Sequence, residues 1–119
     1  MTLPFSPYTR LGEMILTSGQ GPVDMTTGVY RPMSFDEEAR LTLDNLRAVL
    51  DQAGSSMRDV LRVTVYLASM DDYGRFNEIY REYFTAPLPA RSCIAAAGLA
   101  FGMKLELDAM ARVSPAGRS

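Results

Sequence analysis

The alternation of apolar and polar residues predicts two helices, and the first of them covers residues 34–54. Ser34 with Glu37 three positions later has the pattern of a capping box, and Gly54 is a typical helix terminator. Apolar residues recur at steps of three and four, as on the buried face of an amphipathic helix: Ala39, Leu43, Leu46, Leu50 and Ala53. The opposite face is expected to be polar and to carry Glu38, Asp44, Arg47 and Asp51.

The second predicted helix begins near Met70 or Asp71, where acidic side chains suit the positive end of a helix dipole. It must end before Pro87, because proline disfavours helical backbone in the residue that precedes it. Its expected apolar stripe consists of Phe76, Ile79, Tyr80 and Tyr83.

Other segments have patterns typical of strands. Residues 57–69 alternate with a period of two, and this places one set of apolar residues on a single face: Leu61, Val63, Val65 and Leu67. The run EMILTSGQ at 13–20, with the turn DMTTG at 24–28 before VYRP, predicts a hairpin. The last two strands are expected at 90–97 (ARSCIAAA) and 103–112 (MKLELDAMAR), joined by GLAFG.

The resulting order, β-β-α-β-α-β-β, predicts an α+β fold with both helices on one face of a sheet. A chain of 119 residues has too little material to cover the other face as well, so we expect that face to meet another subunit. The length also predicts a single domain over residues 1–119.

The composition of the chain excludes or disfavours several kinds of partner and catalytic site. The formal net charge of -2, without a basic cluster, disfavours nucleic acid as a partner. The sequence begins without the pattern of a signal peptide and has no run of ~20 apolar residues, so we expect a cytoplasmic protein that does not enter a membrane. The absence of histidine excludes a Ser-His-Asp triad, a Cys-His pair and most zinc sites in their usual forms.

The last two strands carry the candidate polar groups, and each has two interpretations. Glu106 and Asp108 share a strand face with Lys104. They are either solvated charges or, at a subunit interface, carboxylates with a tunable pKa that act in acid–base catalysis. Arg91 is either a surface residue at a strand edge or a clamp for a carboxylate. Cys93 is either a small core residue or a nucleophile, and the lack of histidine disfavours the nucleophile.

Two further segments contain weaker candidates. Ser18 and Gly19 end a predicted strand, where a glycine indicates a bulge or a close approach of backbone to another group. Asn77 lies on the second predicted helix, and is either an ordinary surface amide or part of a site.

Eight segments, taken in order and spacing, resemble the RidA family, also called YjgF/YER057c/UK114, from about Pro4 to Ala111. They are LPFS (3–6), ILTSGQGPVD (15–24), TGVY (27–30), TLDNLRAVLDQAG (42–54), DVLRVTVYL (59–67), FNEIYREYF (76–84), PARSC (89–93) and KLELDAMA (104–111). The resemblance implies a chorismate-mutase-like fold with a mixed sheet, assembled as a homotrimeric barrel whose binding clefts lie between subunits.

The resemblance also implies a function, the hydrolysis of reactive enamines and imines such as 2-aminoacrylate to a 2-keto acid and ammonia, without a metal or organic cofactor. Matching motifs would make Arg91 the ligand of the substrate carboxylate. Glu106 would position the attacking water together with the carbonyl of Cys93. The backbone of Ser18 and Gly19 would line the pocket, with Phe5 and Asn77 as further substrate contacts.

Two departures from the family pattern leave the substrate open. Phe5 stands where a tyrosine is typical, and the usual Leu-Pro before the last strand is Leu99-Ala100. These differences fit a Rid subfamily other than archetypal RidA. The alternative function is a non-catalytic or pathway-specific member that binds a small carboxylate, such as a keto acid, between subunits.

Overall fold

Residues 3–115 are described in the structure, a computed structural model, and their central feature is a mixed five-stranded sheet. The strands are β1 (Tyr8–Leu11), β2 (Met14–Thr17), β3 (Val60–Leu67), β4 (Ala90–Ala95) and β5 (Leu105–Arg112), and the α-helices are α1 (Phe35–Gln52) and α2 (Tyr73–Tyr80). Three short 3-10 helices complete the described elements: η1 (Met57–Asp59), η2 (Met70–Asp72) and η3 (Ala100–Gly102). The predicted α+β class is confirmed.

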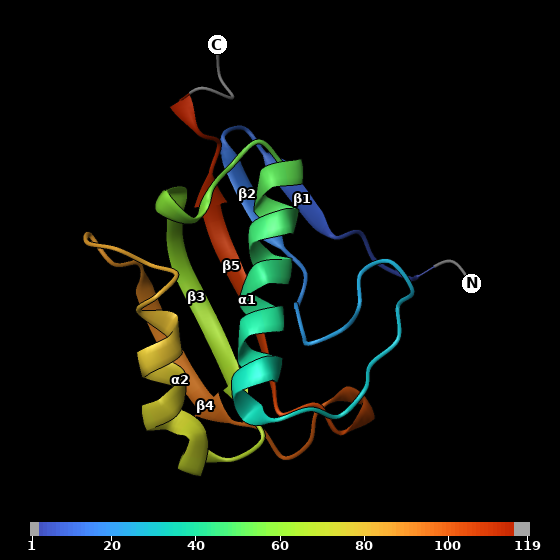
Figure 1. Ribbon diagram of the computed structural model, residues 1–119. Helices are drawn as coiled ribbons and strands as arrows, with labels where there is room; N and C mark the ends of the chain where they lie inside the picture. Colours follow the sequence, from blue (N-terminus) through green and yellow to red (C-terminus); the bar gives the residue numbers. More distant parts are fainter. Residues whose placement is uncertain (1–2, 116–119) are drawn as a thin grey trace.

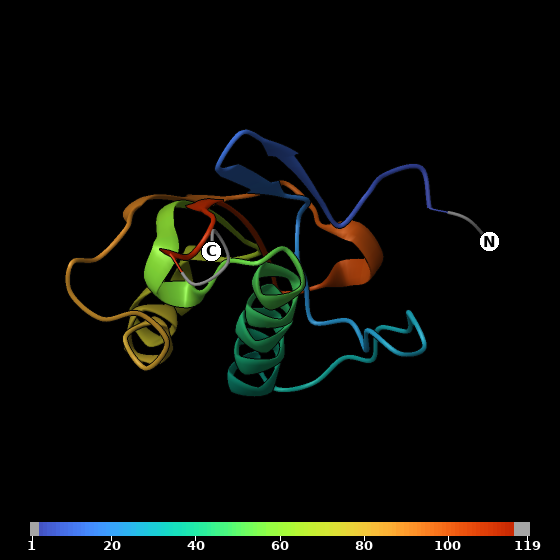
Figure 2. The ribbon, with the colours of Figure 1, turned by 90° about the horizontal axis from the view of Figure 1, so that it is seen from above.

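In the sheet the strands follow the order β1-β2-β5-β3-β4. All neighbouring strands are antiparallel except β3 and β4, which are parallel and are connected through α2. Both helices lie on the same face of the sheet, with α1 over its centre and α2 over the β3–β4 edge (Figures 1 and 2). This arrangement makes β4 an edge strand partly covered by α2.

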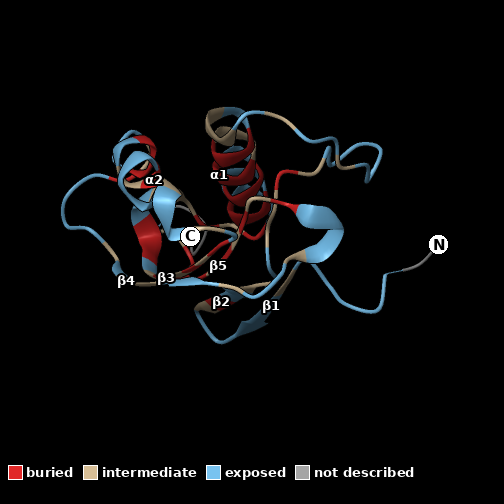
Figure 3. Ribbon diagram, turned by 90° about the horizontal axis from the view of Figure 1, so that it is seen from below, coloured by how far each residue is buried: buried red, intermediate tan, exposed pale blue. Residues whose placement is uncertain are grey.

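The core lies between the helices and the sheet, and the opposite face of the sheet carries no helix (Figure 3). The predicted apolar face of α1 is buried, and so are Val63, Val65 and Leu67 of β3. On the open face, exposed apolar side chains accompany polar ones, among them Leu16, Ile94 and Met110. The bare face that the element order predicts is therefore present in this chain.

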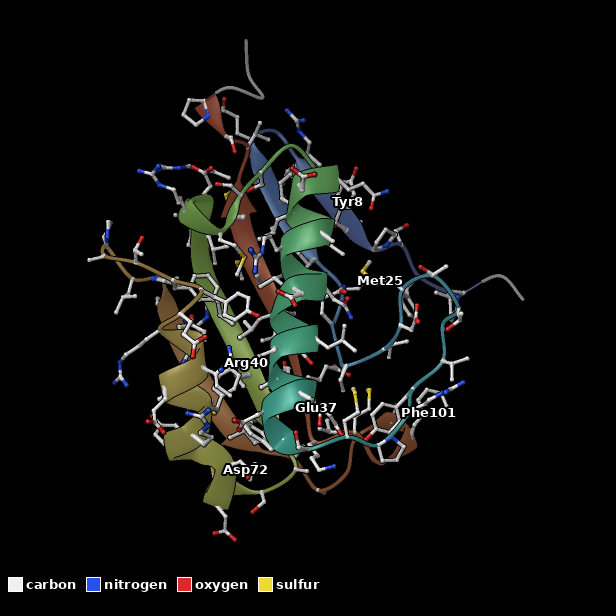
Figure 4. All side chains as sticks on the ribbon, viewed as in Figure 1. Tyr8, Met25, Glu37, Arg40, Asp72 and Phe101 are labelled. Carbon is white, nitrogen blue, oxygen red and sulfur yellow. The ribbon has the colours of Figure 1, made fainter. Side chains whose placement is uncertain are left out.

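Helix α1 begins and ends where the sequence predicts. Ser34 accepts a hydrogen bond from the backbone N–H of Glu37, and the Glu37 side chain accepts one from the backbone of Ser34, which completes the capping box. Gly54, just beyond the end of the helix, has a φ of +82°, a conformation that glycine adopts without steric cost. From α1, Arg40 projects toward α2 and pairs with Glu82 (Figure 4).

Glu38 contradicts its prediction as a solvent-exposed residue of α1, because its side chain is completely buried. Its carboxylate accepts hydrogen bonds from the Lys104 ammonium at 2.9 Å, from the Tyr30 hydroxyl at 2.8 Å, and from the backbone N–H groups of Met33 and Lys104. Burial by itself raises the pKa of this carboxyl, but these donors outweigh burial and hold it below the usual value. Glu38 thus joins α1, the loop before it and the start of β5.

We expect replacement of Glu38 by glutamine to lower the free energy of unfolding by about 3 kcal/mol, since it leaves the Lys104 ammonium and two backbone donors without their charged acceptor. Urea denaturation at pH 7 measures the loss. Because the folded-state pKa of Glu38 is depressed, the difference between the proteins should shrink as the pH falls through that pKa. Glu78→Gln, at an exposed carboxylate on α2, is the control and should change stability by less than about 0.5 kcal/mol. Equal stability of both variants at pH 7 would contradict this account.

The hairpin prediction is wrong in its pairing. Strand β2 lies within the predicted run but pairs with β1, through a turn at Gly12, whose φ is +59°. The turn at 24–28 exists, because the Asp24 carboxylate accepts hydrogen bonds from two backbone N–H groups, but only one bridge flanks it, between Val23 and Tyr30. Prolines on both sides of this turn remove the donors that a longer ladder needs.

The predicted face of β3 is also corrected at one position. Leu61 is 44% exposed, while Val60 is buried in its place. The pairing with β5 shifts between Val60 and Arg62, so Leu61 is the extra residue of a β-bulge. The alternation resumes correctly after the bulge.

Candidate active site

Arg91 lies on the helix-facing side of the edge strand β4. Its Cα partner on β3 is Val63, a fully buried core residue. The guanidinium donates a hydrogen bond of 2.6 Å from Nη2 to Oδ1 of Asn77, on α2. Asn77 is therefore a direct hydrogen-bond partner of Arg91.

Aromatic rings of α2 surround this guanidinium. Its central carbon is 4.8 Å from the ring centroid of Tyr80 and 5.7 Å from those of Tyr73 and Phe76. Such contacts stabilise a cation without neutralising its charge. The ion pairs formed among residues 3–115 do not include Arg91, so its charge stays available for an anion.

A cavity of about 280 Å³ opens beside Arg91, and it is lined by Tyr73, Asn77, Tyr80, Arg81, Leu88, Pro89 and Arg91. Tyr80 is 6% exposed, and its hydroxyl has no hydrogen-bond partner among the described residues. Burial raises the pKa of this tyrosine to about 12, although Arg91 acts in the opposite direction, so the hydroxyl remains a donor at neutral pH. The cavity thus offers cationic and neutral donors and no carboxylate.

Glu106 lies on the opposite face of the sheet, on β5, beside the segment that follows β2. The carboxylate occupies the space next to Gly19: a Cβ atom on Gly19 would lie 2.4 Å from Oε2 of Glu106. The adjoining residues Gln20 and Leu107 exchange two backbone hydrogen bonds, which fix this segment against β5. Burial, and to a lesser extent the charge of Asp108, raises the pKa of Glu106. Glu106 is therefore a half-buried carboxylate whose position depends on a glycine.

Ser18, which precedes Gly19 in the chain, is hydrogen-bonded to the N-terminal segment that contains Phe5. The Ser18 hydroxyl donates to the carbonyl of Ser6 at 2.5 Å, and the Ser18 N–H donates to the carbonyl of Pro7. These bonds hold the residues next to Phe5, which is 57% exposed. Tyr8, labelled in Figure 4, packs against the core and so does not replace the hydroxyl that a tyrosine at position 5 would supply.

Cys93 shares the helix-facing side of β4 with Arg91 and packs against the core. Burial raises the pKa of its thiol, and the nearby Arg91 compensates only in part. The thiol is therefore protonated at neutral pH, which agrees with a structural role for the side chain rather than with nucleophilic catalysis.

The two principal candidates do not meet within one chain. The register pairs Val63 with Arg91 and Tyr66 with Glu106, and successive residues of β3 point to opposite faces. One group, on the helix side, consists of Arg91, Asn77 and the side chain of Cys93. The other, on the open side, consists of Glu106 and Gly19, with Ser18 next to Gly19 in the chain.

A family model described as Endoribonuclease L-PSP matches residues 1–113. This model represents the YjgF/RidA family. The chain belongs to the RidA family. The resemblance seen in the sequence is thereby confirmed.

RidA-family relatives of known name match most of the chain. The Escherichia coli K12 protein named 2-iminobutanoate/2-iminopropanoate deaminase is 38% identical over 111 residues, covering 91% of this chain and 86% of the relative. A second protein of the same strain, named putative reactive intermediate deaminase TdcF, is also 38% identical over 111 residues, covering 91% and 85%.

Solved structures of RidA-family proteins confirm the fold. A putative endoribonuclease from Thermotoga maritima superposes with a TM-score of 0.88 at 39% identity, covering 93% of this chain and 87% of that one. E. coli TdcF with bound serine superposes with a TM-score of 0.86 at 35% identity, covering 96% and 91%. Serine carries a carboxylate, so one structural relative binds a small carboxylate ligand.

The surroundings of Arg91 in this RidA-family chain were only partly predicted. The sequence interpretation assigned Phe76 and Tyr80 to a buried stripe and did not connect them, Tyr73 or Arg81 with Arg91. The signal was the helical spacing, since positions 73, 77, 80 and 81 lie on one side of a helix. Within residues 3–115, no group of three or more His, Cys, Asp or Glu side chains has an arrangement suited to a metal ion, and no helix is long and apolar enough to span a membrane.

Proposed function

We propose that this protein is a cofactor-independent deaminase that hydrolyses 2-imino acids and their enamine tautomers to 2-keto acids and ammonia. The observation that carries the proposal is the guanidinium of Arg91, which is oriented by Asn77, flanked by aromatic rings and unpaired with any described carboxylate. Relatives named as reactive-intermediate and 2-iminobutanoate deaminases support the same reaction class.

Arg91 binds the carboxylate of the substrate in this proposal. A guanidinium grips a carboxylate through two parallel charge-assisted hydrogen bonds, which fix the position of the neighbouring imine carbon. The hydrogen bond to Asn77 and the flanking rings restrict the orientation of the fork before the substrate arrives. The binding energy of the carboxylate thus orients the reacting bond.

Glu106 positions the water that attacks. The oxygen of this water forms a bond to the imine carbon while one of its protons moves to nitrogen, which gives a carbinolamine. The hydroxyl proton of the carbinolamine then moves to nitrogen as the C–N bond breaks, so that ammonia leaves and a carbonyl remains. One water is consumed for each ammonia released. Glu106 in its ionised form accepts a hydrogen bond from the water, together with the carbonyl of Cys93. The protonated imine is already electrophilic, so the reaction needs neither a histidine nor a nucleophilic cysteine.

The active cleft is shared between subunits of a homotrimer. Within one chain, Arg91 and Glu106 lie on opposite faces of the sheet, while the carboxylate carbon and imine carbon of a 2-imino acid are joined by a single bond. One substrate therefore contacts Arg91 of one subunit and Glu106 of its neighbour. The uncovered face, with its exposed Leu16, Ile94 and Met110, supplies apolar surface for such an assembly.

The test is an assay in which an L-amino-acid oxidase generates imines in situ from alanine, 2-aminobutyrate or leucine, and semicarbazide competes for the imine. We expect the protein to speed formation of the keto acid and to lower the yield of the semicarbazone. Unchanged semicarbazone formation with all three imines, and with the glutamate imine produced by glutamate oxidase, would refute the deaminase. If calorimetry then showed binding of 2-oxobutanoate without any turnover, the non-catalytic carboxylate binder would be supported instead. A monomer in sedimentation would refute the shared cleft.

A further inference from the structure

We infer that the preferred substrate carries a second negative charge, so that it is a 2-imino dicarboxylic acid, the imine of an acidic amino acid. This inference rests on the proposed deaminase function. It starts from the lining of the cavity beside Arg91, which contains two arginines, Arg81 and Arg91, and no Asp or Glu. A single α-carboxylate pairs with one of these charges and leaves the other without an anion.

Helix geometry places Arg81 next to the clamp. Arg81 follows Asn77 by four positions, so the two side chains are neighbours on the surface of α2. Asn77 in turn is 2.6 Å from the guanidinium of Arg91. Because Arg81 and Arg91 approach one cavity from α2 and β4, they can bind the two ends of one small dianion.

Arg81 has no anionic partner of its own among residues 3–115. The carboxylates nearest to it on α2 and the segment that follows are engaged elsewhere: Glu82 pairs with Arg40 of α1, and Glu78 pairs with Arg75. The six ion pairs among the described residues include neither Arg81 nor Arg91. Two unpaired cations beside one cavity repel each other, and a dianion relieves that repulsion.

The hydroxyl of Tyr80 is a buried polar group next to this cavity. A buried hydroxyl without a partner is uncommon in folded proteins and costs free energy. Tyr80 is 6% exposed and lines the same cavity, and its hydroxyl has no hydrogen-bond partner within residues 3–115. Because the hydroxyl oxygen itself has almost no accessible surface, the direct contacts to an anion come from Arg81 and Arg91.

The volume of the cavity limits the size of the substrate that it can hold. A volume of about 280 Å³ lies just below the range for ligand pockets, about 300–1,000 Å³. Leu88 and Pro89 line the cavity together with the two arginines and supply apolar surface for one or two methylene groups. The imines of aspartate and glutamate, with one or two methylenes between the imine carbon and the second carboxylate, match this description.

The experiment compares two imines of similar length, one acidic and one neutral. Glutamate oxidase produces the glutamate imine, and L-amino-acid oxidase produces the norleucine imine. We expect kcat/KM for the acidic imine to exceed that for the neutral one by about tenfold or more, since the second carboxylate gains a charge-assisted contact. Arg81→Gln should remove most of this preference by lowering kcat/KM for the acidic imine about tenfold, while the neutral imine changes less than about twofold.

Arg58→Gln is the matched control, because Arg58 lies outside this cavity, forms no ion pair among residues 3–115, and its replacement changes the net charge by the same amount. The control should keep the preference of the wild type. An arginine that serves only the C-terminus of α2 would lower the melting temperature on replacement without changing the ratio of the two substrates, and that result would overturn the inference.

Failure of the inference and failure of the deaminase proposal give different results. Hydrolysis of both imines without an acidic preference would overturn the dicarboxylate inference and leave the deaminase intact. Hydrolysis of neither would refute the deaminase, and calorimetry would then decide the inference from binding of 2-oxoglutarate and 2-oxohexanoate. Tighter binding of 2-oxoglutarate that is lost in Arg81→Gln supports the dianion site, whereas equal binding of the two acids overturns it.

Discussion

Replacement of Arg91 by alanine is expected to lower kcat/KM for imine hydrolysis by about a hundred- to a thousandfold. In the proposed mechanism the guanidinium supplies two charge-assisted hydrogen bonds to the substrate carboxylate, each worth about 1.5–3 kcal/mol, and about 3–4 kcal/mol corresponds to that loss in rate. No other described cation is held in the same way, by an amide at 2.6 Å and three aromatic rings. The in situ imine assay at subsaturating substrate measures the effect directly.

Two comparisons separate chemistry from folding in this prediction. Arg91→Lys keeps the charge but loses the planar fork, so we expect it to retain an intermediate activity, about tenfold below wild type. Arg58→Ala should retain full activity, because its side chain lies outside the cavity. Circular dichroism and sedimentation must show that Arg91→Ala keeps the secondary structure and assembly of the wild type. A folded, assembled Arg91→Ala protein with unchanged kcat/KM would refute the assignment.

Local patterns predicted the elements well and failed where a tertiary contact overrides them. The capping box at Ser34 and the alternation of β3 depend on neighbouring residues only, and both were predicted. Glu38 was assigned to the polar face because its partners Tyr30 and Lys104 are distant in sequence. The bulge at Leu61 depends on the pairing of β3 with β5, which the composition of β3 does not reveal.

The candidate site also depends on contacts between strands that local sequence patterns do not reveal. The alternation within a strand predicts that Arg91 and Cys93 share a face, and that Glu106 and Asp108 share one. It does not relate the face of one strand to that of another, which the pairing of both strands with β3 determines. The roles of Arg91 and Glu106 came from family resemblance, and the opposite orientation of their side chains came only from the structure. That orientation is the reason to divide the cleft between two subunits.

A methyl group at Gly19 is expected to reduce activity through Glu106. The added Cβ would lie 2.4 Å from Oε2 and 2.8 Å from the carboxyl carbon of Glu106, so the carboxylate must move away from the place where the proposed mechanism has it hold water. We expect Gly19→Ala to lower kcat/KM about 10- to 100-fold, and Glu106→Gln to lower it at least as much. Gly98→Ala is the matched control, because a Cβ at Gly98 meets no atom within 4 Å.

The pH dependence of the activity tests whether the ionised form of Glu106 is needed. Burial and the Asp108 charge raise the pKa of Glu106, so the ionised form is lost at a higher pH than for an ordinary glutamate. Activity should therefore fall as the pH decreases through this raised pKa. Asp108→Asn removes one cause of the shift and should move that acid limb to lower pH, whereas Glu106→Gln should abolish the limb.

The double variant distinguishes displacement of Glu106 from a separate effect on the backbone around Gly19. If the methyl group acts only by moving the Glu106 carboxylate, then adding Gly19→Ala to Glu106→Gln costs little further activity, because the group it displaces no longer contributes. If Gly19 instead contacts the substrate through its own backbone, the two losses multiply. Losses that multiply, or a fully active Gly19→Ala protein, would show that Glu106 does not depend on the space that Gly19 leaves.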